Sequence, residues 1–119
     1  MLTEKRQQEL IVLCRELIQR QSYSGEEEQV VARIKQAFQA FGFDSCCVDS
    51  YGNVIGCIKG NRPGKRILFD GHIDTVPVPD DSKWQHAPFA GEVEDGKIYG
   101  RGASDMKGAV SAMIAAAGY

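Results

Sequence analysis

Two side chains that can bind a metal ion stand together after an apolar run. His72 and Asp74 follow Ile67, Leu68 and Phe69, and the segment from Phe69 reads FDGHIDTVP. If the chain is still extended there, both side chains lie on the same face. A neutral imidazole is a common zinc ligand, and a neighbouring carboxylate can fix its tautomer. The pattern indicates either part of a metal site or a hydrogen-bonded structural pair, which is the commoner arrangement.

A third acidic residue stands in a similar position further along the chain. Asp105 lies between a glycine-rich loop and an alanine-rich stretch, in the segment YGRGASDMKG of residues 99–108. One interpretation is an aspartate that caps a helix, which is a common role. The alternative is a second part of the same site, because the glycines allow the backbone to approach a ligand closely. A helix cap would not need Gly100 and Gly102 as well.

Strands must hold these side chains in place. Residues 43–50 and 53–59 are predicted strands joined by a tight turn, and residues 91–94 and 97–99 flank the hairpin signal Asp95-Gly96. Residues 66–70 form a short, continuously apolar run, which predicts a strand buried on both faces. Ligands of open α/β sheets lie beyond the carboxyl ends of the strands, where His72 would be.

Helices precede and follow these strands. Apolar residues at helical spacing predict a helix over residues 3–20. Ser24 and Glu27 form a capping-box pattern that predicts the start of a second helix, and Gly42 is the predicted end of it. Residues 106–117 predict a third, alanine-rich helix. The order of elements indicates an α/β fold with a mixed sheet flanked by helices, and we expect it to be incomplete.

Composition excludes several classes of protein. The 119 residues suit one domain at most, and a net charge of −2 gives no electrostatic reason to bind nucleic acid. No apolar run is long enough to cross a bilayer, and the charged N-terminal segment is not a signal peptide. The 4 cysteines lack metal-binding spacing. They predict unpaired thiols in a reducing compartment, so we expect a cytoplasmic protein.

The two motifs and the loop between them together form a pattern that is specific enough to indicate a protein family. The segment GHIDTVP, a loop with Trp84 and Phe89, and the segment DGKIYGRGASDMKG resemble the M20 family of metallopeptidases and deacylases. The amino-acid sequences of these segments are especially similar to those of YgeY-type peptidases and of the desuccinylase and deacetylase branch. The resemblance implies that residues 1–119 are the N-terminal part of a zinc-peptidase-like catalytic domain, without the lid or dimerisation domain.

The resemblance also implies a role for each motif residue. His72 would bind a first divalent metal, and Asp74 would be the catalytic residue that orients the imidazole. Asp105 would bridge two metals, with zinc as the expected metal and cobalt or manganese as alternatives. The Asp105-Met106 peptide bond would be cis. Such a pair of metals, about 3.5–4 Å apart, activates a water for attack on an amide carbonyl. The implied substrate is a small peptide or an N-acyl amino acid.

Other polar residues are assigned structural roles. We expect His86 to pack in a loop, Arg101 to anchor a loop, and Lys107 to be a solvated charge at a helix start. The acidic run at residues 26–28 is interpreted as helix capping. Trp84 and Phe89 are expected to pack in their loop, and Asp70 to form hydrogen bonds at a strand end.

The residues that would complete catalysis in the family are not in this sequence. The general-base glutamate and the remaining ligands belong downstream of Asp105, so we expect these 119 residues alone to be inactive. The alternatives are a truncated, inactive remnant or interaction module that retains part of the metal site, or a structural α/β domain. Exposed strand edges and apolar faces also predict self-association into a homo-oligomer.

Overall fold

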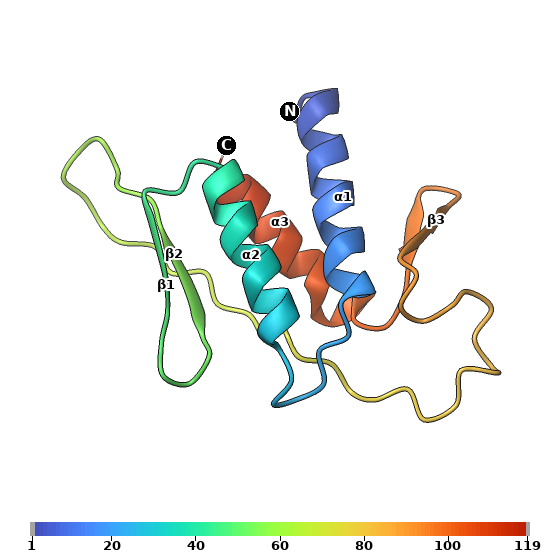
Figure 1. The fold of residues 1–119 in the computed structure, drawn as a ribbon. Coiled ribbons are helices and arrows are strands. Elements are labelled where there is room, and N and C mark those ends of the chain that lie inside the picture. Colours follow the sequence, from blue (N-terminus) through green and yellow to red (C-terminus); the bar gives the residue numbers. More distant parts are fainter. Residues whose placement is uncertain (1, 119) are drawn as a thin grey trace.

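Three α-helices and two small hairpins make up residues 2–118, which are the residues that this computed structural model describes. The mixed α/β class predicted from the sequence is confirmed. Figure 1 shows the three helices side by side, with one hairpin on either side of them. In chain order the elements are α1 (Glu4–Gln19), α2 (Glu28–Ala40), β1 (Ser45–Val48), β2 (Val54–Cys57), β3 (Glu92–Glu94), β4 (Lys97–Tyr99), the wide turn η1 (Ala103–Lys107) and α3 (Gly108–Ala117).

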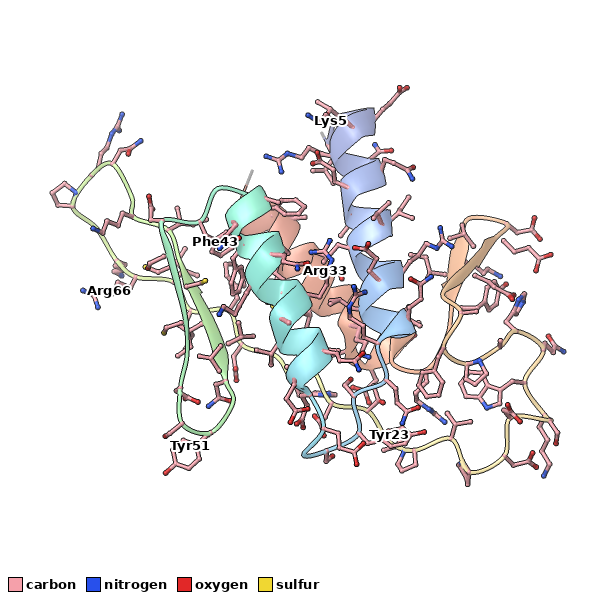
Figure 2. The ribbon with its side chains drawn as sticks, in the orientation of Figure 1. Lys5, Tyr23, Arg33, Phe43, Tyr51 and Arg66 are labelled. Atoms are coloured by element: carbon pink, nitrogen blue, oxygen red, sulfur yellow. The ribbon has the colours of Figure 1, made fainter. Side chains whose placement is uncertain are left out.

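The core lies between the helices. Each helix buries the apolar stripe that its sequence predicts, because only that face can leave water without burying charge. A salt bridge between Arg33 of α2 and Glu16 of α1 (Nε to Oε2, 2.6 Å) also links two helices, and Figure 2 labels Arg33 between them. The buried core residues include Leu13 and Leu17 of α1, Val30, Ile34, Ala37 and Phe38 of α2, and Val110, Ile114 and Ala115 of α3.

Helix α2 ends where the sequence predicts. Gly42 has a φ of 78°, and its N–H donates to Gln39 O at 3.2 Å. The N–H of Phe43 donates to Phe38 O at 2.9 Å, and the two phenyl rings lie 4.4 Å apart. These two hydrogen bonds and the apolar contact form the Schellman motif that commonly closes a helix with glycine.

The predicted start of α2 is wrong in its detail. Glu27 occupies the N-cap position, and its carboxylate accepts a hydrogen bond from the N–H of Gly25 at 2.8 Å. The hydroxyl of Ser24 does not cap the helix. It donates instead to Asp74 Oδ2 at 2.6 Å, from a residue 50 positions away in the chain. A tertiary partner therefore replaces the local one that the capping-box pattern predicts.

Both predicted hairpins are confirmed. Strands β1 and β2 pair antiparallel, and Asp49 closes their turn by accepting from the N–H groups of Tyr51 and Asn53, each at 2.9 Å. Tyr51 points away from the molecule at the tip of this turn (Figure 2). Strands β3 and β4 also pair antiparallel around Asp95 and Gly96, whose φ angles of 49° and 74° are those of a type I′ turn.

The predicted buried strand at residues 66–70 is wrong. The segment has no strand conformation, and Ile67, Leu68 and Phe69 are 80%, 88% and 60% exposed. A strand buried on both faces needs paired neighbours and covering elements, and no described segment supplies them to these residues. The chain instead crosses from β2, on one side of the helices, toward β3 on the other (Figure 1).

A few residues later, hydrogen bonds fix this crossing segment to the rest of the fold. Thr75 forms a parallel β-bridge with Tyr23, and the N–H of Thr75 donates to Ser22 O at 2.8 Å. The buried hydroxyl of Ser22 donates to Ile73 O at 2.8 Å. Residues 73–75 are thereby held against the connection between α1 and α2. No helix in the described part of the chain has the length and apolar character needed to cross a membrane.

Candidate metal centre

The structure brings together the three side chains predicted to form the site. His72 Nε2 lies 2.8 Å from Asp105 Oδ1, although 33 residues separate them in the chain. On the other side of the ring, Nδ1 lies 3.0 Å from the backbone oxygen of Asp74 and 3.3 Å from its carboxylate. The hydrogen bond to Asp105, followed by that to the Asp74 carbonyl, raises the pKa of His72. Each ring nitrogen therefore faces a different acidic residue.

Asp74 is fixed from behind by Ser24. The hydroxyl of Ser24 donates to Asp74 Oδ2 at 2.6 Å, and this hydrogen bond is the main cause that lowers the pKa of Asp74. The other carboxylate oxygen is the one that faces His72. A carboxylate held in this way can set the orientation and tautomer of an imidazole. Sequence reasoning missed Ser24, because its local pattern gives the helix cap as the simpler role.

Asp105 does not cap the third helix. Its φ and ψ of −129° and 91° are not helical, and Lys107 occupies the N-cap position of α3. The peptide bond between Asp105 and Met106 is cis, as the family resemblance implied. The side chain of Asp105 is 87% exposed, so its carboxylate is open to solvent apart from the contact with His72. The helix-cap interpretation of Asp105 is therefore wrong.

Lys107 is buried, which corrects the prediction of a solvated charge. It is fully inaccessible to solvent, and its Nζ donates to Leu17 O and Arg20 O, each at 2.8 Å. Both acceptors belong to the C-terminal end of α1, where the helix dipole favours a positive charge. Burial lowers the pKa of Lys107 to about 8. The ammonium thus ties the turn that carries Asp105 to the first helix.

A cavity of about 430 Å³ adjoins these side chains. One wall carries His72, Asp74 and Thr75, and another is the glycine-rich loop that leads to Asp105. Trp84 lines the cavity and also stacks against Arg101, whose guanidinium carbon lies 4.9 Å from the indole ring centroid. Trp84 therefore packs in its loop as predicted, and its indole also lines the cavity.

The second histidine belongs to a different cluster. His86 Nδ1 lies 2.6 Å from a Glu92 carboxylate oxygen, and Nε2 lies 3.4 Å from one of Glu94. Its ring stacks on Tyr99 with the centroids 3.8 Å apart. Because these contacts fasten the loop to the β3–β4 hairpin, the predicted packing role of His86 is confirmed. Phe89 of the same loop packs edge-on against Tyr23 in the connection between α1 and α2, with the ring centroids 6.3 Å apart.

The donor set fits part of a metal site. An imidazole nitrogen and a carboxylate oxygen converge, and the outer ring nitrogen has the kind of partner that metal-bound histidines have. Within residues 2–118, however, no group of three or more His, Cys, Asp or Glu side chains is placed to hold an ion. Asp70, for which we predicted strand-end bonding, makes no hydrogen bond within this range and lies in the exposed segment.

Comparison with known proteins finds similar sequences for both the second half and most of the length of this chain. Residues 68–118, which contain all three site residues, match the model of peptidase family M20/M25/M40. Succinyl-diaminopimelate desuccinylase of Xanthobacter autotrophicus is 61% identical over 54 residues, which are 45% of this chain and 14% of that protein. Proteins of the same name from Halorhodospira halophila and Methylocella silvestris are 42% identical over 106 residues and 36% identical over 114 residues.

The matches to the last two proteins cover 87% and 90% of this chain, but 28% and 29% of the relatives. The chain therefore spans less than a third of the length of the curated relatives that it matches. Residues 68–118 are therefore similar to peptidase family M20/M25/M40, and most of the chain is similar to proteins named succinyl-diaminopimelate desuccinylase.

Proposed function

We propose that this chain supplies part of the metal centre of a hydrolase that cleaves the amide bond of a small N-acyl amino acid or peptide. His72 and Asp105 would bind divalent metal, and Asp74 would orient the imidazole. The names of the relatives support an acyl amide as the substrate, since a desuccinylase removes a succinyl group from an amine. A pair of divalent ions, zinc in the first instance, would polarise the amide carbonyl and activate a water.

One observation carries the proposal. The Nε2 atom of His72 and the Oδ1 atom of Asp105 approach to 2.8 Å from two loops that are far apart in the chain. A histidine with a purely structural role needs only a hydrogen-bond partner for each ring nitrogen, and a buried His–Asp pair would provide these partners. Here both side chains are instead largely exposed at a cavity, 47% for His72 and 87% for Asp105. Exposed polar pairs contribute little to stability, which favours a role in binding.

The chain's own groups have separate tasks in this proposal. Asp74, fixed by Ser24, holds the ring so that Nε2 faces the cavity. Lys107, fixed to α1, holds the turn so that Asp105 faces Nε2. A catalytic zinc site has three protein ligands, so two ligands predict weak binding by residues 2–118 alone. The remaining ligands and the general base would come from further residues of a longer protein.

Binding of Mn²⁺, followed by paramagnetic broadening in NMR spectra, tests the site directly. Manganese prefers carboxylate and imidazole over the chain's free thiols, so the cysteines interfere less than with zinc. We expect Mn²⁺ to broaden the amide signals around His72 and Asp105 selectively. His72→Ala and Asp105→Ala should each abolish this broadening, whereas His86→Ala, which removes the other histidine, should leave it unchanged.

Two results would contradict the proposal. One is broadening that survives in both His72→Ala and Asp105→Ala, and the other is broadening centred on Glu92 and Glu94. The proposal that the protein is a hydrolase is tested by sequencing the DNA that follows the codon for Tyr119. An open frame with a further Glu-Glu pair supports the enzyme, and a stop codon supports the inactive remnant.

A further inference from the structure

We propose that Arg101, Trp84 and Thr75 form a carboxylate-binding subsite next to the candidate metal centre. The subsite would hold a free carboxylate of the substrate, so its role in catalysis rests on the proposed function. Binding of the carboxylate itself does not require a metal. The three residues line the same cavity of about 430 Å³ as His72 and Asp105.

Arg101 is held in a defined position. Its backbone N–H donates to Pro88 O at 2.7 Å, which fixes the loop between Gly100 and Gly102. Its guanidinium lies over the indole of Trp84, with 4.9 Å from the central carbon to the ring centroid. Stacking on an aromatic face leaves the in-plane N–H groups free to donate sideways. A guanidinium that is oriented before binding loses less entropy for each hydrogen bond that it forms.

Arg101 also lacks the partners that a partly buried cation normally has. No Asp or Glu side chain in the described part of the chain forms an ion pair with it. Its Nε is buried without a hydrogen-bond partner. Buried polar groups in proteins are normally hydrogen-bonded, and those that are not need an explanation. The acidic residues of the cavity are engaged elsewhere, Asp74 with Ser24 and Asp105 with His72.

Thr75 supplies a second, independent observation. Its side chain is 5% exposed, and its Oγ1 is buried without a hydrogen-bond partner. Thr75 follows Asp74 directly, and its backbone is fixed to Ser22. A hydroxyl donor and an unpaired guanidinium in the wall of one cavity can together satisfy the two oxygens of a carboxylate.

The proposed function selects a carboxylate over other anions. A desuccinylase substrate carries a free carboxylate at the far end of its acyl group, at a short distance from the amide bond. Arg101 belongs to the same loop as Asp105, only four residues before it. A cation at that position would bind acyl groups that end in a carboxylate in preference to acyl groups of similar size without charge.

Fluorescence of Trp84 can report on this subsite, because it is the only tryptophan in the sequence. The probe is succinate, added to the metal-free protein in the presence of a chelator. We expect a saturable change in Trp84 fluorescence, and no such change with the neutral analogue succinamide. Arg101→Gln and Thr75→Val should weaken succinate binding, by about 10-fold or more for the arginine, which is the effect of losing one charge-assisted contact.

The control is Arg62→Gln, which removes a charge from an exposed loop remote from the cavity and should not alter binding. Far-UV circular dichroism verifies that each variant is folded, and Arg101→Lys replaces Arg101→Gln if the latter is not. Equal responses to succinate and succinamide would overturn the subsite, and so would unchanged affinity in the Arg101 variant. Equal binding of inorganic phosphate would overturn its selectivity for carboxylate.

The two proposals can fail separately. Arg101→Gln should retain the Mn²⁺ broadening around His72 and Asp105, because the substitution leaves the proposed ligands in place. Loss of succinate binding with retained Mn²⁺ broadening supports the subsite and the metal centre together. Succinate binding without any specific Mn²⁺ broadening would keep the subsite and refute the metal centre.

Discussion

Gly102 is a residue at which adding a single methyl group should disturb the candidate site. It has a φ of 81°, and an added Cβ atom would lie 2.7 Å from Thr75 Cγ2 and 3.3 Å from Lys107 Cδ. Thr75 follows the segment with His72 and Asp74, whereas Lys107 anchors the turn with Asp105. Gly102→Ala should therefore push apart the two loops that meet at the site.

The size of the effect follows from two separate costs. A residue other than glycine with positive φ costs about 1–2 kcal/mol. Overpacking at a fixed position adds about 1–3 kcal/mol. Gly52→Ala is the matched control, because Gly52 has a φ of 86° and its added Cβ would meet nothing within 4 Å. The restriction of the unfolded chain is the same in both variants, so it cancels in the comparison.

We expect Gly102→Ala to lower the free energy of unfolding by about 1–3 kcal/mol more than Gly52→Ala does. Urea unfolding, followed by Trp84 fluorescence and far-UV circular dichroism, measures this difference. The NMR signals of the His72 ring should shift in Gly102→Ala and stay in place in Gly52→Ala. Equal stabilities for the two variants, within about 0.5 kcal/mol, would refute the reasoning, because they would mean that the two loops separate at no cost.

Three further predictions concern single side chains. Ser24→Ala should reduce the free energy of unfolding by about 1 kcal/mol, since the hydrogen bond to Asp74 is lost, and urea unfolding as stable as that of the original chain would contradict this. Burial raises the pKa of the Cys14 thiol, so a thiol reagent should modify the exposed Cys47 and leave Cys14 unmodified until the protein unfolds. Hydrogen bonds from the hairpin turn lower the pKa of Asp49 below 3.8, so the carboxylate stabilises the turn above pH 3.8 and this stabilisation is lost as the pH falls through the lowered value. The amide shifts of the turn should titrate below pH 3.8, and a midpoint at or above that value would show that the turn does not hold the charged form.

Features that depend on neighbours in the sequence were predicted well. The Asp95-Gly96 turn and the glycine end of α2 each require backbone angles that few residues adopt, so the residue types identify them. The apolar spacing of α1 likewise gave a helix within one or two residues of its observed ends. His72, Asp74 and Asp105 were identified from motifs, and the structure adds the distances that join them.

Features that depend on distant neighbours were not predicted. Residues 66–70 have the composition of a buried strand, but composition does not supply the strands that must pair with it. Ser24 has a local capping pattern, and a carboxylate 50 residues away is its actual partner. A lysine is expected at the surface, yet Lys107 finds two carbonyl groups at the end of α1. In each instance the decisive group lies far away in the chain.

The anchoring of Lys107 has a consequence for the order of folding. Its acceptors are 87 and 90 residues earlier in the chain, so the turn that carries Asp105 can take its position only after α1 has docked. Closing so long a loop is slow compared with forming a helix or a hairpin. The approach of His72 to Asp105 should thus be among the last events of folding, and metal affinity would report when the chain has completed it.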